Sequence, residues 1–91
     1  MLKISETRLA GERCRITLEG RIVGPWVEAL HEFIESRCSP QELPILDLGE
    51  VSFADPEGVR LLKSLQQRGV PLCHPSPFLT EQLKAAGSIR F

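Results

Sequence analysis

Two short segments of this chain carry side chains that are suited to chemistry. Cys73 and His74 are adjacent, and a thiol beside an imidazole is the pair of groups that nucleophilic cysteine catalysis uses. Asp55 and Glu57 flank a proline, and two carboxylates together with His74 are conceivable metal ligands. Neighbouring strand residues point in opposite directions, however, so one Cys–His dyad is not expected. Because the carboxylates lack the spacing of a known metal motif, we expect neither a metal nor a cofactor.

Each of these residues also has a purely structural interpretation. Asp55 precedes Pro56, and aspartate before proline is typical of a helix start, because the carboxylate accepts free backbone N–H groups of the first turn. Glu57 then lies in that first turn, where a negative charge suits the helix dipole. Cys73 is expected to be a buried thiol beside a loop histidine. The sequence alone thus favours a helix start over a catalytic site.

Composition excludes several classes of function. The 91 residues include 11 basic and 12 acidic side chains, a net charge of -1, which is unlike proteins that bind a phosphate backbone. Tyrosine is absent, and Trp26 is the only tryptophan, so a base-stacking surface is not expected either. No apolar run has the length of a membrane span. A binding module without nucleic acid and without membrane insertion is the expected class.

Other signals favour a cytoplasmic protein that is not an enzyme. Three cysteines, Cys14, Cys38 and Cys73, are an odd number without paired spacing, which favours reduced thiols in the cytoplasm over disulfides. The first residues have no signal-peptide core. Glycine patterns of dinucleotide and phosphate-binding loops are missing, as is a serine on a strand-to-helix elbow. We therefore expect no catalytic residues.

The elements that would position these side chains alternate between strand and helix. A hairpin of two strands is predicted around Gly11, with an irregularity in the first strand, which changes phase. Further strands are predicted over 44–48 and 70–73, and a last one over 89–91. Helices are predicted after Pro25, Pro56 and Pro77, the second ending at Gly69. The expected buried stripe of the first helix comprises Trp26, Val27, Leu30, Phe33 and Ile34, with Trp26 as its anchor, and Phe78 belongs to that of the third.

This order predicts an α/β fold with one open, mostly parallel sheet of four to five strands. The first strand is expected to be antiparallel, and the three helices to lie mainly on one face, because the strands alternate between apolar and polar residues. Sites on such sheets gather beyond the carboxyl ends of the strands. The loops at residues 24–26, 55–58 and 73–74 are therefore expected to meet there.

Two segments resemble a known family. Residues 18–25, Leu-Glu-Gly-Arg-Ile-Val-Gly-Pro, are similar to the passage from the second strand to the first helix of STAS domains, the sulfate-transporter and anti-sigma-factor-antagonist family. Residues 45–55, Ile-Leu-Asp-Leu-Gly-Glu-Val-Ser-Phe-Ala-Asp, resemble its third strand and the following loop. The resemblance implies a β-α superhelix that forms a single domain over residues 1–91, without the family's usual C-terminal helix. It also implies a protein that is not an enzyme.

The resemblance further implies a partner and a site. Anti-sigma factor antagonists bind an anti-sigma factor that is a serine kinase, and the kinase phosphorylates the second serine of a motif at the start of the second helix. Glu57 stands at that position and Pro56 at the serine before it, while Asp55 and Gly58 match the motif. Because Glu57 has no hydroxyl, it cannot accept the phosphate; it either mimics the phosphorylated form or marks a lost switch. The expected partner surface comprises Asp55, Pro56, Glu57, Gly58, Arg60 and Leu61.

Two alternatives stay open. The first is a STAS-type accessory subunit of a membrane ABC transport complex for lipids or anions, which would bind the ATPase subunit through the same helix. The second belongs to another class, a small ligand binder or thiol enzyme that uses Cys73 and His74. A concave pocket beside these two residues would favour it.

Overall fold

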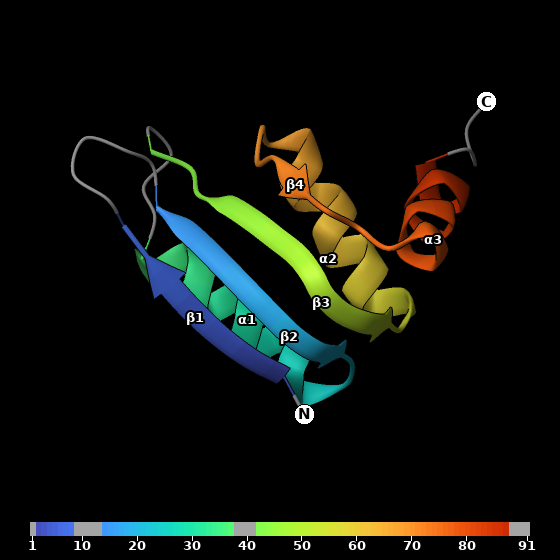
Figure 1. Ribbon diagram of the computed structural model, residues 1–91, viewed down its shortest axis with the longest axis horizontal. Helices are drawn as coiled ribbons and strands as arrows, with labels where there is room; N and C mark the ends of the chain where they lie inside the picture. The colour runs from blue at the N-terminus through green and yellow to red at the C-terminus, as the bar shows by residue number, and fades with distance from the viewer. Residues whose placement is uncertain (1, 9–13, 38–41, 88–91) are drawn as a thin grey trace.

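Four strands form one open sheet, flanked by three helices (Figure 1). The computed structural model describes residues 2–8, 14–37 and 42–87. In chain order the elements are β1 (Leu2–Thr7), β2 (Arg15–Ile22), α1 (Pro25–Arg37), β3 (Ile45–Ala54), α2 (Pro56–Gln67), β4 (Leu72–Cys73) and α3 (Pro77–Gly87). The strands lie in the order β1-β2-β3-β4.

Strand pairing confirms the predicted α/β topology. β1 is antiparallel to β2, whereas β3 is parallel to both β2 and β4. The irregularity that we predicted in the first strand is absent between Leu2 and Thr7, which pair in continuous register with Gly20 to Arg15. The turn at Gly11 and the strand over 89–91 lie outside the described residues.

The irregularities lie instead between β2 and β3. The register shifts between Thr17 and Glu19 and again between Gly20 and Arg21, because β3 carries an extra residue at each place. These bulges explain why β3 continues to Ala54, well beyond the predicted strand over 44–48: an extra residue changes the alternation without ending the pairing. The buried residues of β3 accordingly stand at uneven spacing: Leu46, Leu48, Val51 and Ala54.

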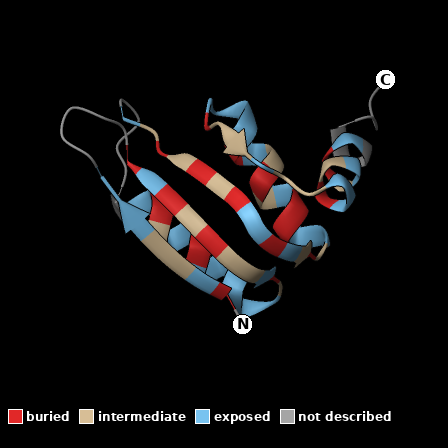
Figure 2. Cartoon of the chain, viewed as in Figure 1, coloured by how far each residue is buried: buried red, intermediate tan, exposed pale blue. Residues whose placement is uncertain are grey.

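The core lies between one face of the sheet and the helices, as predicted. In Figure 1, α1 and α2 lie behind the sheet, and α3 lies beyond β4, beside α2. Buried and less buried residues alternate over the first half of β2 (Figure 2), and Ile16, Leu18 and Ile22 are fully buried. The helices contribute Leu30, Ile34, Leu62, Leu65 and Leu79 to this core. The opposite face of the sheet carries the outward side chains of its strands, such as Arg15.

Two aromatic residues contradict the sequence pattern. Trp26, predicted to anchor α1 in the core, is 36% exposed, and Phe78 of α3 is 55% exposed. Both residues lie in the first turn of their helices, at the sheet edge where β2 and β3 end. The helical period places an apolar residue on a face of the helix, but a first turn can project beyond the sheet that this face covers.

Candidate functional site

Asp55 joins two loops that are far apart in the sequence. Its Oδ1 accepts a hydrogen bond from the backbone N–H of Gly58 at 2.7 Å, which confirms that Asp55 caps α2. Its Oδ2 accepts from the backbone N–H of Gly24, before α1, at 2.9 Å. These N–H groups, that of Gly24 first, lower the pKa of the Asp55 carboxyl, because they stabilise the carboxylate. One side chain therefore fixes the starts of α1 and α2 relative to each other.

Gly58 allows this turn to press against the end of β2. A Cβ atom at Gly58 would lie 2.6 Å from the carbonyl oxygen of Ile22 and 3.0 Å from its Cγ2. The same Ile22 oxygen accepts a hydrogen bond from the backbone N–H of Asp55 at 3.1 Å. Only glycine permits so close an approach of two backbones. Gly58 is buried and has no side chain. Within the expected partner surface it therefore shapes the turn and does not itself contact a partner.

Glu57 projects from this turn into solvent. Its side chain is 70% exposed, and Oε2 lies 2.9 Å from the NH2 nitrogen of Arg60, one turn further along α2. Pro56 is also exposed, whereas Leu61 is half-buried. The structure thus gathers the predicted residues at the start of α2 but divides their roles. Asp55 and Gly58 hold the turn, Pro56, Glu57 and Arg60 face outward, and Leu61 packs partly against the core.

His74 does not join the other loops, contrary to the prediction from topology. β4 is two residues long and pairs with Leu46 and Asp47 near the start of β3. Its carboxyl end therefore lies beside the first half of β3, whereas Asp55 follows the end of that strand, roughly 20 Å further along. A metal site of Asp55, Glu57 and His74 is not formed. Within the described residues, no group of three or more His, Cys, Asp or Glu side chains is arranged to hold a metal ion.

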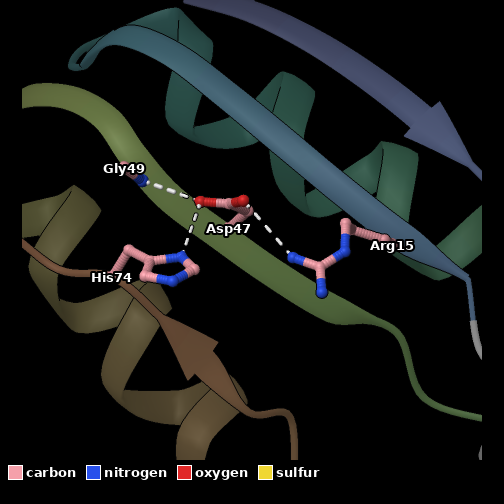
Figure 3. A network of polar contacts seen from close by, with 4 residues as sticks. All are labelled: Arg15, Asp47, Gly49 and His74. Carbon is pink, nitrogen blue, oxygen red and sulfur yellow. Dashed lines mark hydrogen bonds and ion pairs between the residues drawn. The ribbon is translucent and has the colours of Figure 1, made fainter.

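His74 instead belongs to a polar network centred on Asp47 (Figure 3). Its backbone has a positive φ of 57°, and its Nδ1 lies 3.4 Å from Asp47 Oδ1. The same oxygen accepts the backbone N–H of Gly49 at 2.9 Å, while Arg15 NH1 lies 3.3 Å from Oδ2. The N–H of Gly49 is the main cause that lowers the Asp47 pKa; His74 and Arg15 act in the same direction, and burial opposes them. The sequence indicated only the polar character of Asp47, because its partners lie on β2, on β3 and directly after β4.

A second cluster that the sequence did not predict lies at the end of β3. The rings of Phe53 and Phe78 stack with centroids 6.2 Å apart, and the guanidinium of Arg21 lies 5.6 Å from the centre of the Phe53 ring. Arg21 and Phe53 are register partners on neighbouring strands. Knowing that pairing would have indicated the contact, but the register is shifted by the bulge, so sequence spacing alone did not.

A groove between α1 and α2 was also missed. It has a volume of about 760 Å³, and both Glu57 and Leu61 line it. Cys73 and His74 line neither this groove nor a smaller one bounded by α2, β4 and α3. In the described residues, no helix is both long and apolar enough to cross a membrane.

Comparison with solved structures finds a similar fold in other proteins. The structure of the anti-sigma factor antagonist SpoIIAA in its unphosphorylated form matches with a TM-score of 0.70, over 90% of this chain and 82% of that one, at 20% sequence identity. The chain has the STAS fold. The resemblance noted in the sequence is thereby confirmed at the level of the fold.

A second solved structure, that of Mglu, matches with a TM-score of 0.60 at 26% identity. The match covers 80% of this chain but 19% of Mglu, so the STAS-like chain corresponds to a small part of that larger protein. No protein-family model and no curated protein sequence matches the chain.

Proposed function

We propose that this chain is a cytoplasmic protein-interaction module and that its partner surface centres on the first turn of α2. The STAS fold, shared with an anti-sigma factor antagonist, supports an interaction module over an enzyme. The turn itself supports the location, because Asp55 and Gly58 hold it in place through backbone contacts. A rigid turn loses little conformational freedom on binding, which favours affinity. The proposal assigns the chain no catalytic step.

The observation that carries this proposal is the exposed carboxylate of Glu57 on that held turn. STAS antagonists have a serine at this position, and its phosphorylation controls partner binding. A phosphoserine carries a charge of about -1.5 to -2, whereas Glu57 carries a permanent -1. Glu57 therefore sets partner choice by a fixed charge, without a kinase-dependent switch at this residue. Arg60, at 2.9 Å, orients the carboxylate and remains solvated with it.

Titration calorimetry tests the role of this charge. The partner offered is a purified anti-sigma factor of the serine-kinase class, at low and at high salt, with wild type, Glu57→Ser and Glu57→Gln. We expect both variants to change affinity by at least about tenfold at low salt and by less at high salt, since an interfacial charge acts through screened electrostatics. Tighter binding by the variants would indicate a mimic of the phosphorylated form, and weaker binding a basic contact on the partner.

The matched control is Glu81→Gln, which removes one exposed carboxylate from α3. It should leave the affinity unchanged at both salt concentrations. If the anti-sigma factor does not bind, the same titration with the ATPase subunit of a transporter asks whether this surface serves the other expected partner. Equal affinities for wild type and both Glu57 variants toward a partner that does bind would overturn the proposal.

A further inference from the structure

The groove between α1 and α2 has an apolar floor and charged walls. We call it the α1–α2 groove; its lining residues are Gly24, Val27, Glu28, His31, Glu57, Arg60, Leu61, Lys63, Ser64 and Gln67. Val27 and Leu61 form the floor of the groove, because both are half-buried and pack against the hydrophobic core. The small residues Gly24 and Ser64 leave space over them. An apolar strip therefore stays open to solvent between the two helices.

The two walls carry opposite net charge. On the α1 wall, Glu28 is the one residue of fixed charge, and no ion pair links it to another described residue. On the α2 wall, Arg60 and Lys63 outnumber Glu57, and Glu57 is already paired with Arg60. Lys63 makes a hydrogen bond of 3.4 Å to the neutral Gln66 and has no acidic partner within the described residues. Among the described residues, neither Glu28 nor Lys63 has a partner of opposite charge, so both can pair with charges of a bound partner.

Side-chain contacts link α1 and α2 at the C-terminal end of the groove. Both helices follow parallel strands and run in the same direction, so their C-terminal ends lie side by side. There Arg68 NH1 donates to Glu35 Oε2 at 2.7 Å, and His31 Nε2 lies 3.4 Å from the same oxygen. The Arg68 contact is the main cause that lowers the pKa of Glu35. The other end of the groove lies at Gly24 and Glu57, so the groove continues directly from the proposed partner surface.

We propose that the α1–α2 groove binds an amphipathic α-helix of the partner, with basic residues on the flank facing Glu28 and acidic residues on the flank facing Lys63. This inference rests on the proposed function and adds the chemistry of the partner segment. The lining from Glu57 to Gln67 spans about 15 Å along α2, which matches about three turns of a bound helix. Apolar residues at a spacing of three and four would cover Val27 and Leu61.

The groove has the make-up of a protein-binding surface. Its apolar centre, formed by Val27 and Leu61, is bordered by charged side chains that project into solvent, and Arg60 has 66% of its side chain exposed. An apolar centre inside a polar rim is the anatomy of a protein interface.

Designed peptides of about 14 residues test this proposal directly. Each has leucines at helical spacing and differs only in its flanks: glutamate on both, lysine on both, or glutamate on one and lysine on the other. Amide shifts of the labelled full chain report the site and the dissociation constant. We expect the mixed peptide to bind wild type at least about fivefold more tightly than either uniform peptide, with shifts at Val27, His31, Leu61 and Ser64.

Charge reversal on one wall should then change the preferred peptide. Glu28→Lys makes both walls basic and should favour the glutamate peptide, whereas Lys63→Glu makes both walls acidic and should favour the lysine peptide. The matched controls are Glu32→Lys on α1 and Lys3→Glu on β1, which change the net charge equally outside the groove. Both controls should keep the wild-type preference. The amide spectra themselves show whether each variant is folded.

Several outcomes would overturn the proposal. These are no shifts at the groove, a preference unaffected by Glu28→Lys and Lys63→Glu, or the same shifts on raising the concentration of the protein alone, which would assign the groove to a second copy. If dodecanoate displaced the peptide at a concentration below that of the peptide, the groove would be assigned to a lipid chain. None of these measurements uses a Glu57 variant. A negative result with the peptides would therefore not contradict the proposed role of Glu57, and a negative result in the Glu57 titration would not contradict helix binding in the groove.

Discussion

Two aspartates on or next to β3 are used in different ways. Both carboxylate oxygens of Asp55 accept hydrogen bonds from backbone N–H groups, those of Gly58 and Gly24. Asp47 accepts one backbone hydrogen bond, from Gly49 on its own strand, and its other contacts are with the side chains of Arg15 and His74. The end of the sheet is thus fixed by backbone, and its open face is held by solvated side chains. Of the two regions, the turn at Asp55 is the one that is held through backbone contacts on both carboxylate oxygens.

The glycines of the two regions differ in the same way, and substituting them should give the largest effect. At Gly58 an added methyl group meets the backbone of Ile22 at 2.6 Å, whereas at Gly49 it meets the Asp47 carboxylate at 3.2 Å. A side chain can move away, but the backbone of β2 cannot. We expect Gly58→Ala to lower the free energy of unfolding by about 1–3 kcal/mol. Urea unfolding of wild type and variant measures this.

Gly49→Ala is the matched variant in the open-face region. It should cost less than Gly58→Ala, because the Asp47 side chain can rotate. If the two substitutions proved equally destabilising, the distinction between a backbone-fixed and a side-chain-held region would be wrong.

Removing the Asp55 carboxylate should have the next largest effect. Asp55→Ala leaves the N–H groups of Gly58 and Gly24 without their acceptor, so both the helix cap and the link between the loops are lost. We expect the thermal midpoint to fall by about 3–10 °C. Asp55→Ser is the control, because a serine can still cap α2 but is too short to hold both loops. Its thermal midpoint should lie between that of wild type and that of Asp55→Ala. An unchanged midpoint in Asp55→Ala would contradict the bridging role.

The smallest expected effect is a difference in acid stability. The folded state lowers the pKa of Asp47, so this carboxylate contributes stability that is present above its unfolded pKa and is lost as the pH falls through the folded pKa. Urea unfolding from about pH 6 to about pH 3 should therefore show a shallower loss for Asp47→Asn than for wild type. The two curves should converge at the acid end. Parallel curves for Asp47→Asn and wild type would show that the Asp47 carboxylate adds no pH-dependent stability.

Features that depend on residues close together in the chain could be predicted from the sequence. Asp55 before Pro56 predicted the start of α2, and Gly69, with a φ of 100°, marked its end. Ser76 before Pro77 did the same for α3, where its hydroxyl accepts the N–H of Leu79. Caps and turns follow from hydrogen bonds and dihedral preferences that act within a few residues. The alternation of strands and helices then left few topologies, and the predicted one is correct.

Features that depend on residues far apart in the chain could not be predicted, because they follow from strand register and packing. The bulges of β3 result from its pairing with β2, and the short β4 leaves His74 beside Asp47 and away from Asp55. The exposure of Trp26 depends on where the sheet ends, and the α1–α2 groove on how two helices pack. Periodicity gives the face on which a side chain lies, but register and packing decide what that face meets. The sequence could therefore indicate candidate residues for contact with a partner, such as Glu57 and Leu61, but not the groove that these residues line.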